Sequence, residues 1–209
     1  MENLFDLNTL SGKIINEESE LIPLMTSDDE EAINKEKLPK SLSILPLKNT
    51  VLFPGVVIPI TATRNKSVKL IKAANKGDKL IGVVSQINNK VSDPKIGDIN
   101  NIGTVAKILR VLQMPDGNLT IIIQGKKRFK IEKILSEKPF IKADICEISE
   151  IKPQKNDKKY NATIDSIKEL ALKIIDENPN IPSEASIAIK NIHSNTFLVN
   201  FVSSNMNIS

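Results

Sequence analysis

The sequence predicts an α+β protein in which a β-rich lobe carrying one helix precedes a small α-helical lobe. Three observations predict this: residues 1–40 are acidic without an apolar period, residues 41–151 hold short apolar runs between turn signals, and residues 152–209 have apolar residues at helical spacing. The 209 residues suffice for one large or two small domains, and 40% of them are hydrophobic. We therefore expect an aliphatic core.

Residues 1–40 are predicted to be a disordered tail. They hold ten acidic residues and four lysines, and the run Ser27-Asp28-Asp29-Glu30-Glu31 has no apolar pattern around it. The remaining residues hold fifteen acidic and twenty-five basic side chains, so the folded part is moderately basic. That charge favours an acidic partner or nucleic acid, or simply keeps the surface soluble.

The β-rich lobe begins with two predicted strands joined by a turn. The first strand covers residues 42–47, and Pro46 places it at a sheet edge or bulge because proline cannot donate to the ladder. The segment Leu52-Phe53-Pro54-Gly55 is a turn, since proline presets φ at its first central position and glycine tolerates a positive φ at the next. Residues 56–60 form the second strand.

A helix over residues 64–76 follows, with Thr63 as its predicted N-cap and Gly77 just beyond its end. The polar residues 88–101 are predicted to be a loop, whose length makes it a candidate for mobility or partner contact. The other elements of this lobe are strands at 80–84, 103–114, 119–123, 129–134 and 140–148, a hairpin turn at 115–118 and a basic bend at 124–128.

The helical lobe starts after a polar linker at about 152–159. A first helix carries an apolar stripe and ends before Pro179, and a second covers 183–192. A third is capped by Ser194 or Asn195. Its apolar face, expected to be core or a subunit contact, consists of Phe197, Leu198, Phe201 and Val202.

Residues for common catalytic and metal-binding chemistry are sparse. The single cysteine, Cys146, excludes an internal disulfide and a Cys-rich zinc site, and we expect a buried structural thiol. The single histidine, His193, is expected to have a surface or capping role. No phosphate-binding G-x-x-x-x-G-K-[ST] loop and no G-x-S-x-G elbow is present. We therefore expect no catalytic residue, cofactor or metal in this chain.

The sequence lacks an apolar run near the ~18 residues of a membrane span and a signal peptide at residues 1–20. A cytoplasmic location without a membrane partner is therefore expected.

Several blocks of the β-rich lobe resemble the N-terminal domain of Lon-type ATP-dependent proteases. They are collinear over residues 42–148, and residues 157–209 resemble the helical region that follows in that family. Two departures are Asn49, where the family commonly has an acid, and the Asn-rich loop at 88–101. The blocks are LPLKNTVLFPGVVIPI at 45–60, Arg64-x-Lys66-Ser67, IGTVAKI at 102–108, MPDGN at 114–118 and QGKKR at 124–128.

The resemblance implies a PUA-like β pseudo-barrel with its helix packed against it. It also implies a parent protein: a hexameric ATP-dependent serine protease that uses ATP and Mg and degrades misfolded and regulatory proteins. The implied role of this region is recognition of unfolded or damaged protein and assembly of the ring. We expect the ATPase and protease modules beyond Ser209; a stand-alone LON-domain scaffold is the alternative.

Recognition of unfolded polypeptide requires exposed apolar surface, and apolar residues in turns need not be buried. Phe53 has the alternative role of plugging the barrel. The candidate substrate-binding residues are Leu52, Phe53, Pro54, Met114 and Pro115.

A second candidate site is the densest basic cluster of the sequence. It would contact the phosphate backbone of DNA, or it is simply a solvated hairpin end. The cluster consists of Lys126, Lys127, Arg128 and Lys130.

Overall fold

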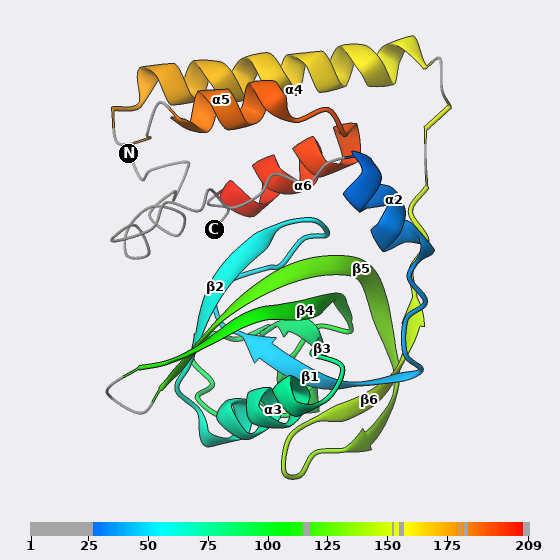
Figure 1. The fold of residues 1–209 in the computed structure, drawn as a ribbon, viewed down its shortest axis with the longest axis vertical. Helices are drawn as coiled ribbons and strands as arrows, with labels where there is room; N and C mark the ends of the chain where they lie inside the picture. Colours follow the sequence, from blue (N-terminus) through cyan, green and yellow to red (C-terminus); the bar gives the residue numbers. More distant parts are fainter. Residues whose placement is uncertain are drawn as a thin grey trace. The chain divides into compact units, whose positions relative to one another are not determined.

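The computed structural model describes residues 27–114, 118–151, 153–154, 157–179, 181 and 184–206. These residues fall into two compact units, drawn as a ribbon in Figure 1. The β unit comprises Ile33–Ser149, and the helical unit comprises the described residues on either side of it. One boundary therefore lies inside helix α2 (Ser27–Lys35), before the expected start of the β-rich lobe at residue 41.

Helix α2 lies in the segment that was predicted to be a disordered tail, so that prediction is wrong for residues 27–35. The acidic run occupies its first turns and Lys35 its last turn, and both arrangements are favourable to the helix dipole. Ile33 is buried, with 7% of its surface exposed. The burial of Ile33 and the favourable arrangement of charges thus stabilise this helix, although it lacks a regular apolar pattern. Residues 1–26 lie outside the described residues.

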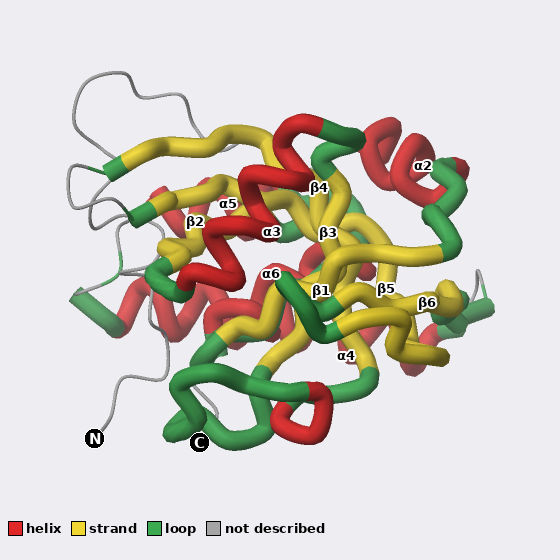
Figure 2. The backbone as a smooth tube through the Cα atoms, turned by 90° about the horizontal axis from the view of Figure 1, so that it is seen from below, coloured by secondary structure: helices red, strands yellow, loops and turns green. Residues whose placement is uncertain are grey.

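The β unit is built on one six-stranded sheet with the order β2-β5-β4-β3-β1-β6. An additional pairing of β5 with β6 closes a ring of five strands, to which β2 is attached through β5. This near-closed sheet confirms the predicted α+β pseudo-barrel, and Figure 2 shows the strands with α3 beside them. The strands are β1 (Ser41–Leu47), β2 (Val57–Ala62), β3 (Leu80–Ser85), β4 (Ile102–Gln113), β5 (Leu119–Ser136) and β6 (Lys142–Glu147).

Strand β5 is continuous, so the bend predicted at residues 124–128 lies within one strand and does not separate two. Gly125 pairs with Ala106 on β4 and Arg128 pairs with Thr104, so β5 has one more residue than β4 between these two pairs. A β-bulge absorbs the extra residue and turns the strand without ending it. The 18 residues of β5 can therefore pair with β2, β4 and β6 in turn.

Two prolines lie where the ladder tolerates them. Pro46 is in the half of β1 that pairs with β3, while β6 pairs with the other half, Ser41–Ser43. Beside β2, the Gly125 N–H donates to the Val56 carbonyl at 2.9 Å. In an antiparallel ladder the backbone groups of successive residues point alternately toward and away from the neighbouring strand, so the nitrogen of Pro59 points away from β5. Neither proline therefore interrupts a strand.

Helix α3 (Asn65–Lys76) packs its buried Leu70 and Ile71 into the core of the β unit. Its N-cap is Arg64, without a side-chain cap, so the prediction of Thr63 is wrong. The reason is non-local, because the Arg64 guanidinium bonds to the Gln86 side chain and fixes the start of the helix there. At the other end Gly77 has φ −104°, and Lys79 takes the positive φ of 62° instead.

The apolar core of the β unit consists of two clusters. One of them contains the Phe129 ring, which is fully buried and lies against Gly82 and Gly103. A Cβ added at either glycine would meet this ring. The first cluster includes Leu45, Leu47, Leu52, Leu70, Ile71, Ile81, Ile108, Ile121 and Ile123, and the second includes Leu42, Ile44, Val84, Val105, Phe129, Ile141 and Ala143.

The helical unit contains α4 (Lys158–Glu177), α5 (Glu184–Asn191) and α6 (Asn195–Asn205). Asp157 caps α4 by accepting the Tyr160 N–H at 3.0 Å. Ser194, one of the two predicted caps, begins α6 by accepting the Phe197 N–H at 3.1 Å. Phe197 and Leu198 are buried as expected. Among the helices that the structure describes, none is both long and apolar enough to cross a lipid bilayer.

Candidate functional site

The β4–β5 hairpin and the adjoining strand β2 present one face to the core and the opposite face outward. Ile121 and Ile123 of β5 are fully buried, and Ile58 and Ile60 of β2 pack against the same cluster. Because successive side chains of a strand point to opposite faces, Ile122 must project away from that core. Ile121 and Ile123 therefore lie on the core face of the sheet, and Ile122 lies on the outward face.

Register places a row of residues on this outward face. Ile122 pairs with Pro59 on β2 and with Arg110 on β4, and the next row consists of Thr61, Thr120 and Leu112. The hydroxyl oxygens of Thr61 and Thr120 are 3.1 Å apart and confirm that these two side chains share a face.

Two apolar side chains on this face are exposed toward the hairpin end. Leu112 is 37% exposed and Met114 42% exposed. Pro59 and Ile122 are half-buried beside them. We call these four residues, Pro59, Leu112, Met114 and Ile122, the hairpin face. Met114 was predicted as a site residue, and Pro115 lies outside the described residues.

The turn at residues 52–55 forms as predicted, but its apolar side chains are not all exposed. Gly55 has φ 80°, and the Val56 N–H donates to the Phe53 carbonyl at 3.2 Å. The expected exposure is wrong for Leu52 and Pro54, which are both buried. Gly125 has no Cβ, which lets the backbone carbonyl of Phe53 approach β5 closely, and the Leu52 side chain joins the core beside it. Leu52 thus fills the role considered for Phe53.

Polar contacts fix the position of this turn over the sheet. The Thr104 hydroxyl donates to the Leu52 carbonyl at 2.6 Å in a buried position. Phe53 is partly buried, with the Arg128 guanidinium carbon 6.0 Å from its ring centroid, a cation–π arrangement. The turn is thus anchored on both sides.

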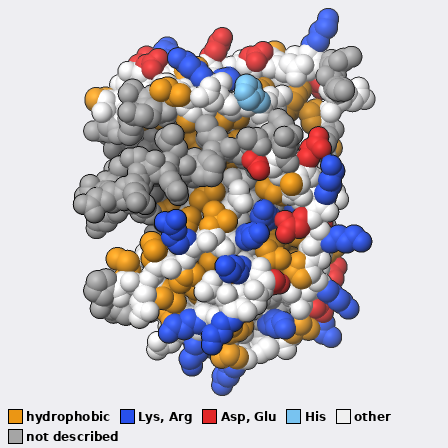
Figure 3. Space-filling view, in the orientation of Figure 1, with side chains coloured by type: hydrophobic (Ala, Val, Ile, Leu, Met, Phe, Trp, Pro, Cys, Tyr) orange, Lys and Arg blue, Asp and Glu red, His pale blue; other side chains and the backbone are white. Residues whose placement is uncertain are grey.

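The basic cluster of the sequence lies on β5 and is largely engaged within the β unit. Lys126 is 3.8 Å from a Glu36 carboxylate oxygen, and Lys127 is 3.0 Å from one of Glu147. Their side chains are only 13% and 12% exposed. Arg128 lies over Phe53, while Lys130 is exposed. Figure 3 shows further Lys and Arg side chains spread over the β unit among apolar ones.

The two rare side chains of the sequence are both on the surface. The expectation of a buried thiol is wrong, since Cys146 is exposed. It follows the inward-facing Ile145 on β6 and so projects outward. His193 is exposed, as expected, just before the α6 cap. Among the described residues, no group of three His, Cys, Asp or Glu side chains is placed to hold a metal.

Prediction from the sequence missed Leu112, Pro59 and Ile122. A usable signal was present in Ile121-Ile122-Ile123, because an apolar run in a strand with one core face must expose its middle residue. The buried role of Leu52 had no local signal, since this part of the turn contacts Thr104 and Gly125 far along the chain.

Comparison with known proteins gives consistent results. The family described as the ATP-dependent protease La (LON) substrate-binding domain matches residues 41–209. A Lon protease of Flavobacterium johnsoniae is 61% identical over 206 residues, which cover 99% of this chain and 25% of that protein. A Lon protease of Cytophaga hutchinsonii is 51% identical over 188 residues, 90% of this chain and 23% of that protein.

A solved structure supports the fold. The N-terminal domain of a Mycobacterium avium complex Lon protease matches with a TM-score of 0.63 at 19% identity, over 78% of this chain and 81% of that one. The chain spans about a quarter of the length of the curated relatives it matches.

Proposed function

Since this chain belongs to the family of Lon (ATP-dependent protease La) substrate-binding domains, we propose that its β unit binds unfolded polypeptide through the hairpin face. The observation that carries the proposal is the accessibility of Leu112 and Met114, at 37% and 42%, next to half-buried Pro59 and Ile122. An exposed apolar patch on a folded domain marks an interaction site.

The chemistry of the hairpin face suits varied partners. Methionine is flexible and polarizable, so Met114 can adapt to different apolar side chains. Thr61 and Thr120 border the patch, and their hydroxyl groups can donate to or accept from a polypeptide backbone. A folded client hides its apolar residues and backbone groups, so this combination favours unfolded segments.

The parent protein supplies the remaining functions of the proposal. We infer that a ring of such chains carries out ATP-dependent serine proteolysis in the cytoplasm, with ATP and Mg bound by modules outside these residues. Repetition of a weak site around a ring raises the effective concentration of a captured client. The isolated chain should therefore bind unfolded protein more weakly than the assembled parent.

The proposal is tested by fluorescence anisotropy with a labelled, reduced and alkylated protein that stays unfolded. Replacing both Leu112 and Met114 by Ser should weaken binding about tenfold or more, because two apolar contacts are lost. Leu135→Ser is the matched control, since Leu135 is 47% exposed elsewhere on β5 and should leave binding unchanged. Equal affinities of the double variant and the wild-type protein would refute the role of the hairpin face.

The same experiment includes duplex DNA at low and at physiological salt. Binding to nucleic acid through phosphates falls steeply as salt is added. The ion pairs of Lys126 and Lys127 do not favour this alternative. Preference for DNA over unfolded protein at physiological salt would transfer the proposal to the basic cluster.

A further inference from the structure

The loop between β3 and β4 buries Pro94 and Ile99 in the β unit. Pro94 is buried, whereas Ser92, Asp93 and Lys95 around it are exposed. Pro94 lines a small pocket, called the loop pocket here, which is partly open to solvent and has about 20 Å³ of free space, room for about one water molecule. Its apolar walls come from β1, α3 and the segment before β6, and they include Ile44, Leu45, Leu70, Phe140 and Ile141.

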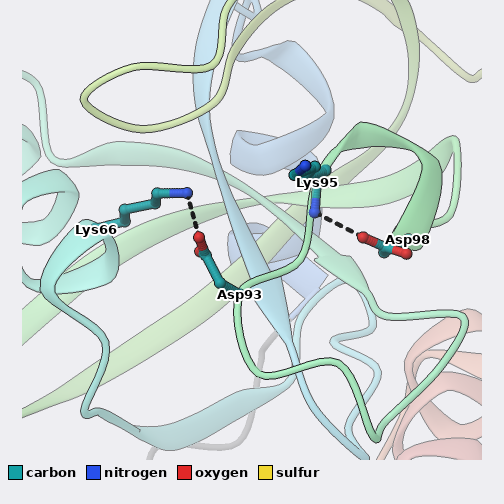
Figure 4. A network of polar contacts seen from close by, with 4 residues as sticks. All are labelled: Lys66, Asp93, Lys95 and Asp98. Carbon is teal, nitrogen blue, oxygen red and sulfur yellow. Dashed lines mark hydrogen bonds and ion pairs between the residues drawn. The ribbon is translucent and has the colours of Figure 1, made fainter.

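Asp93, which precedes this proline, forms an ion pair with Lys66 at the rim of the loop pocket. Figure 4 shows Lys66 of α3 pointing to Asp93, with Nζ and Oδ2 2.6 Å apart. Both side chains are well exposed, at 45% and 62%, and such ion pairs contribute little to stability in water. Arg64 also lines the pocket. The charged side chains lining it are therefore two cations and one carboxylate, an excess of one positive charge.

The two ends of the loop are fastened independently of its middle. At one end, the Gln86 side-chain amide donates to the carbonyls of Asn88 and Val91, at 3.3 and 3.0 Å. At the other, the Lys95 N–H donates to the Asp98 carboxylate at 2.9 Å, as Figure 4 shows, and Ile99 bridges to Gln86. None of these contacts involves residues 92–94, so they do not hold this segment in the pocket.

We propose that Asp93-Pro94 occupies a second polypeptide-binding site in the unbound protein. An unfolded client that presents an acidic residue followed by an apolar one displaces Asp93-Pro94 from this site. This inference rests on the proposed function, that the domain binds unfolded polypeptide. The client carboxylate takes the place of Asp93 on Lys66, and the client side chain takes the place of Pro94 against Ile44, Leu70 and Ile141. The excess positive charge of the pocket favours the acidic partner.

Two substitutions separate this competition from a merely structural ion pair. Asp93→Asn weakens the internal occupant but leaves Lys66 for the client, so binding should tighten, by up to about fivefold for an exposed pair. Lys66→Ala removes the group that both carboxylates use, so binding should be no tighter than in the wild-type protein. Lys69→Ala is the matched control, because it removes an exposed lysine of the same helix.

The probes are labelled Gly/Ser peptides with a single Asp-Leu, Asp-Gly or Lys-Leu pair, titrated into the whole chain by anisotropy. The Asp-Leu peptide should bind best, and it alone should shift the methyl NMR signals of Ile44 and Ile141. Equal effects of Asp93→Asn and Lys66→Ala, or equal binding of Asp-Leu and Asp-Gly, would overturn the proposal.

The proposed function is judged separately with the alkylated protein and the Leu112→Ser/Met114→Ser variant. If that variant loses client binding while the peptide results go against the loop pocket, the hairpin face stands and the second site falls. If the peptides behave as expected but the variant binds clients normally, the second site stands and the role of the hairpin face falls.

Discussion

The contact between the Phe129 ring and Gly82 can be tested by a double-mutant cycle. Phe129 is fully buried, so Phe129→Ala should cost about 3–5 kcal/mol through lost burial and a cavity. A Cβ at Gly82 would lie 2.9 Å from Cζ of Phe129 and 2.7 Å from Cδ1 of Ile44. Both are ends of side chains, which can shift, so Gly82→Ala should cost about 1–3 kcal/mol by overpacking.

In the double variant the new methyl group enters space that the ring has left. The combined cost should therefore fall short of the sum of the single costs by about 1 kcal/mol or more. The assay is urea unfolding followed by far-UV circular dichroism, with linear extrapolation to water for each variant.

The control uses Gly97, where an added Cβ would meet nothing within 4 Å. Gly97→Ala and Phe129→Ala should add to within about 0.5 kcal/mol, as distant sites do. The same additivity for Gly82 would refute the inferred contact, and the close packing of β3 and β5 around this ring would need another explanation.

Two further stability predictions concern single hydrogen bonds. Thr104→Val should destabilise the β unit by about 1–3 kcal/mol because the buried Leu52 carbonyl loses its hydrogen-bond donor. Thr61→Val, on the exposed face, should destabilise the β unit far less. Equal urea midpoints of the two variants would contradict this prediction. Ser194→Ala should weaken α6 by about 1 kcal/mol through loss of the cap on Phe197 N–H, seen as faster amide exchange in its first turn; unchanged exchange there would contradict the capping role.

Features encoded by neighbouring residues were predictable from the sequence. Pro54-Gly55 predicted the turn, the apolar stretch at 103–114 before the Asp-Gly turn predicted strand β4, and Ser194 predicted the start of α6. In each case the deciding interaction lies within a few residues, so turn chemistry, strand period and capping act on the local chain.

Features that depend on distant residues were not predictable. The start of α3 at Arg64 follows from the Gln86 side chain, the burial of Leu52 from Gly125 and Thr104, and the path of β5 from a bulge. The candidate site shows the same division. Met114 could be chosen from its turn, but Leu112, Ile122 and Pro59 become one surface only when three strands are in register.

The small size of the hairpin face bears on how such a domain can discriminate. Its four side chains are already partly covered, so a client can gain only a fraction of the ~1.5–3 kcal/mol of a fully buried apolar side chain at each. Association also costs several kcal/mol of lost freedom, so an affinity no tighter than about 1 mM, or −4 kcal/mol, is expected for this face alone. A second site for an acidic–apolar pair would change this outcome. Two weak contacts on one client multiply through effective concentration, and a segment carrying both signals would be held much longer than a segment carrying one. Selectivity would then arise from the spacing of signals along an unfolded chain, which no folded client can present.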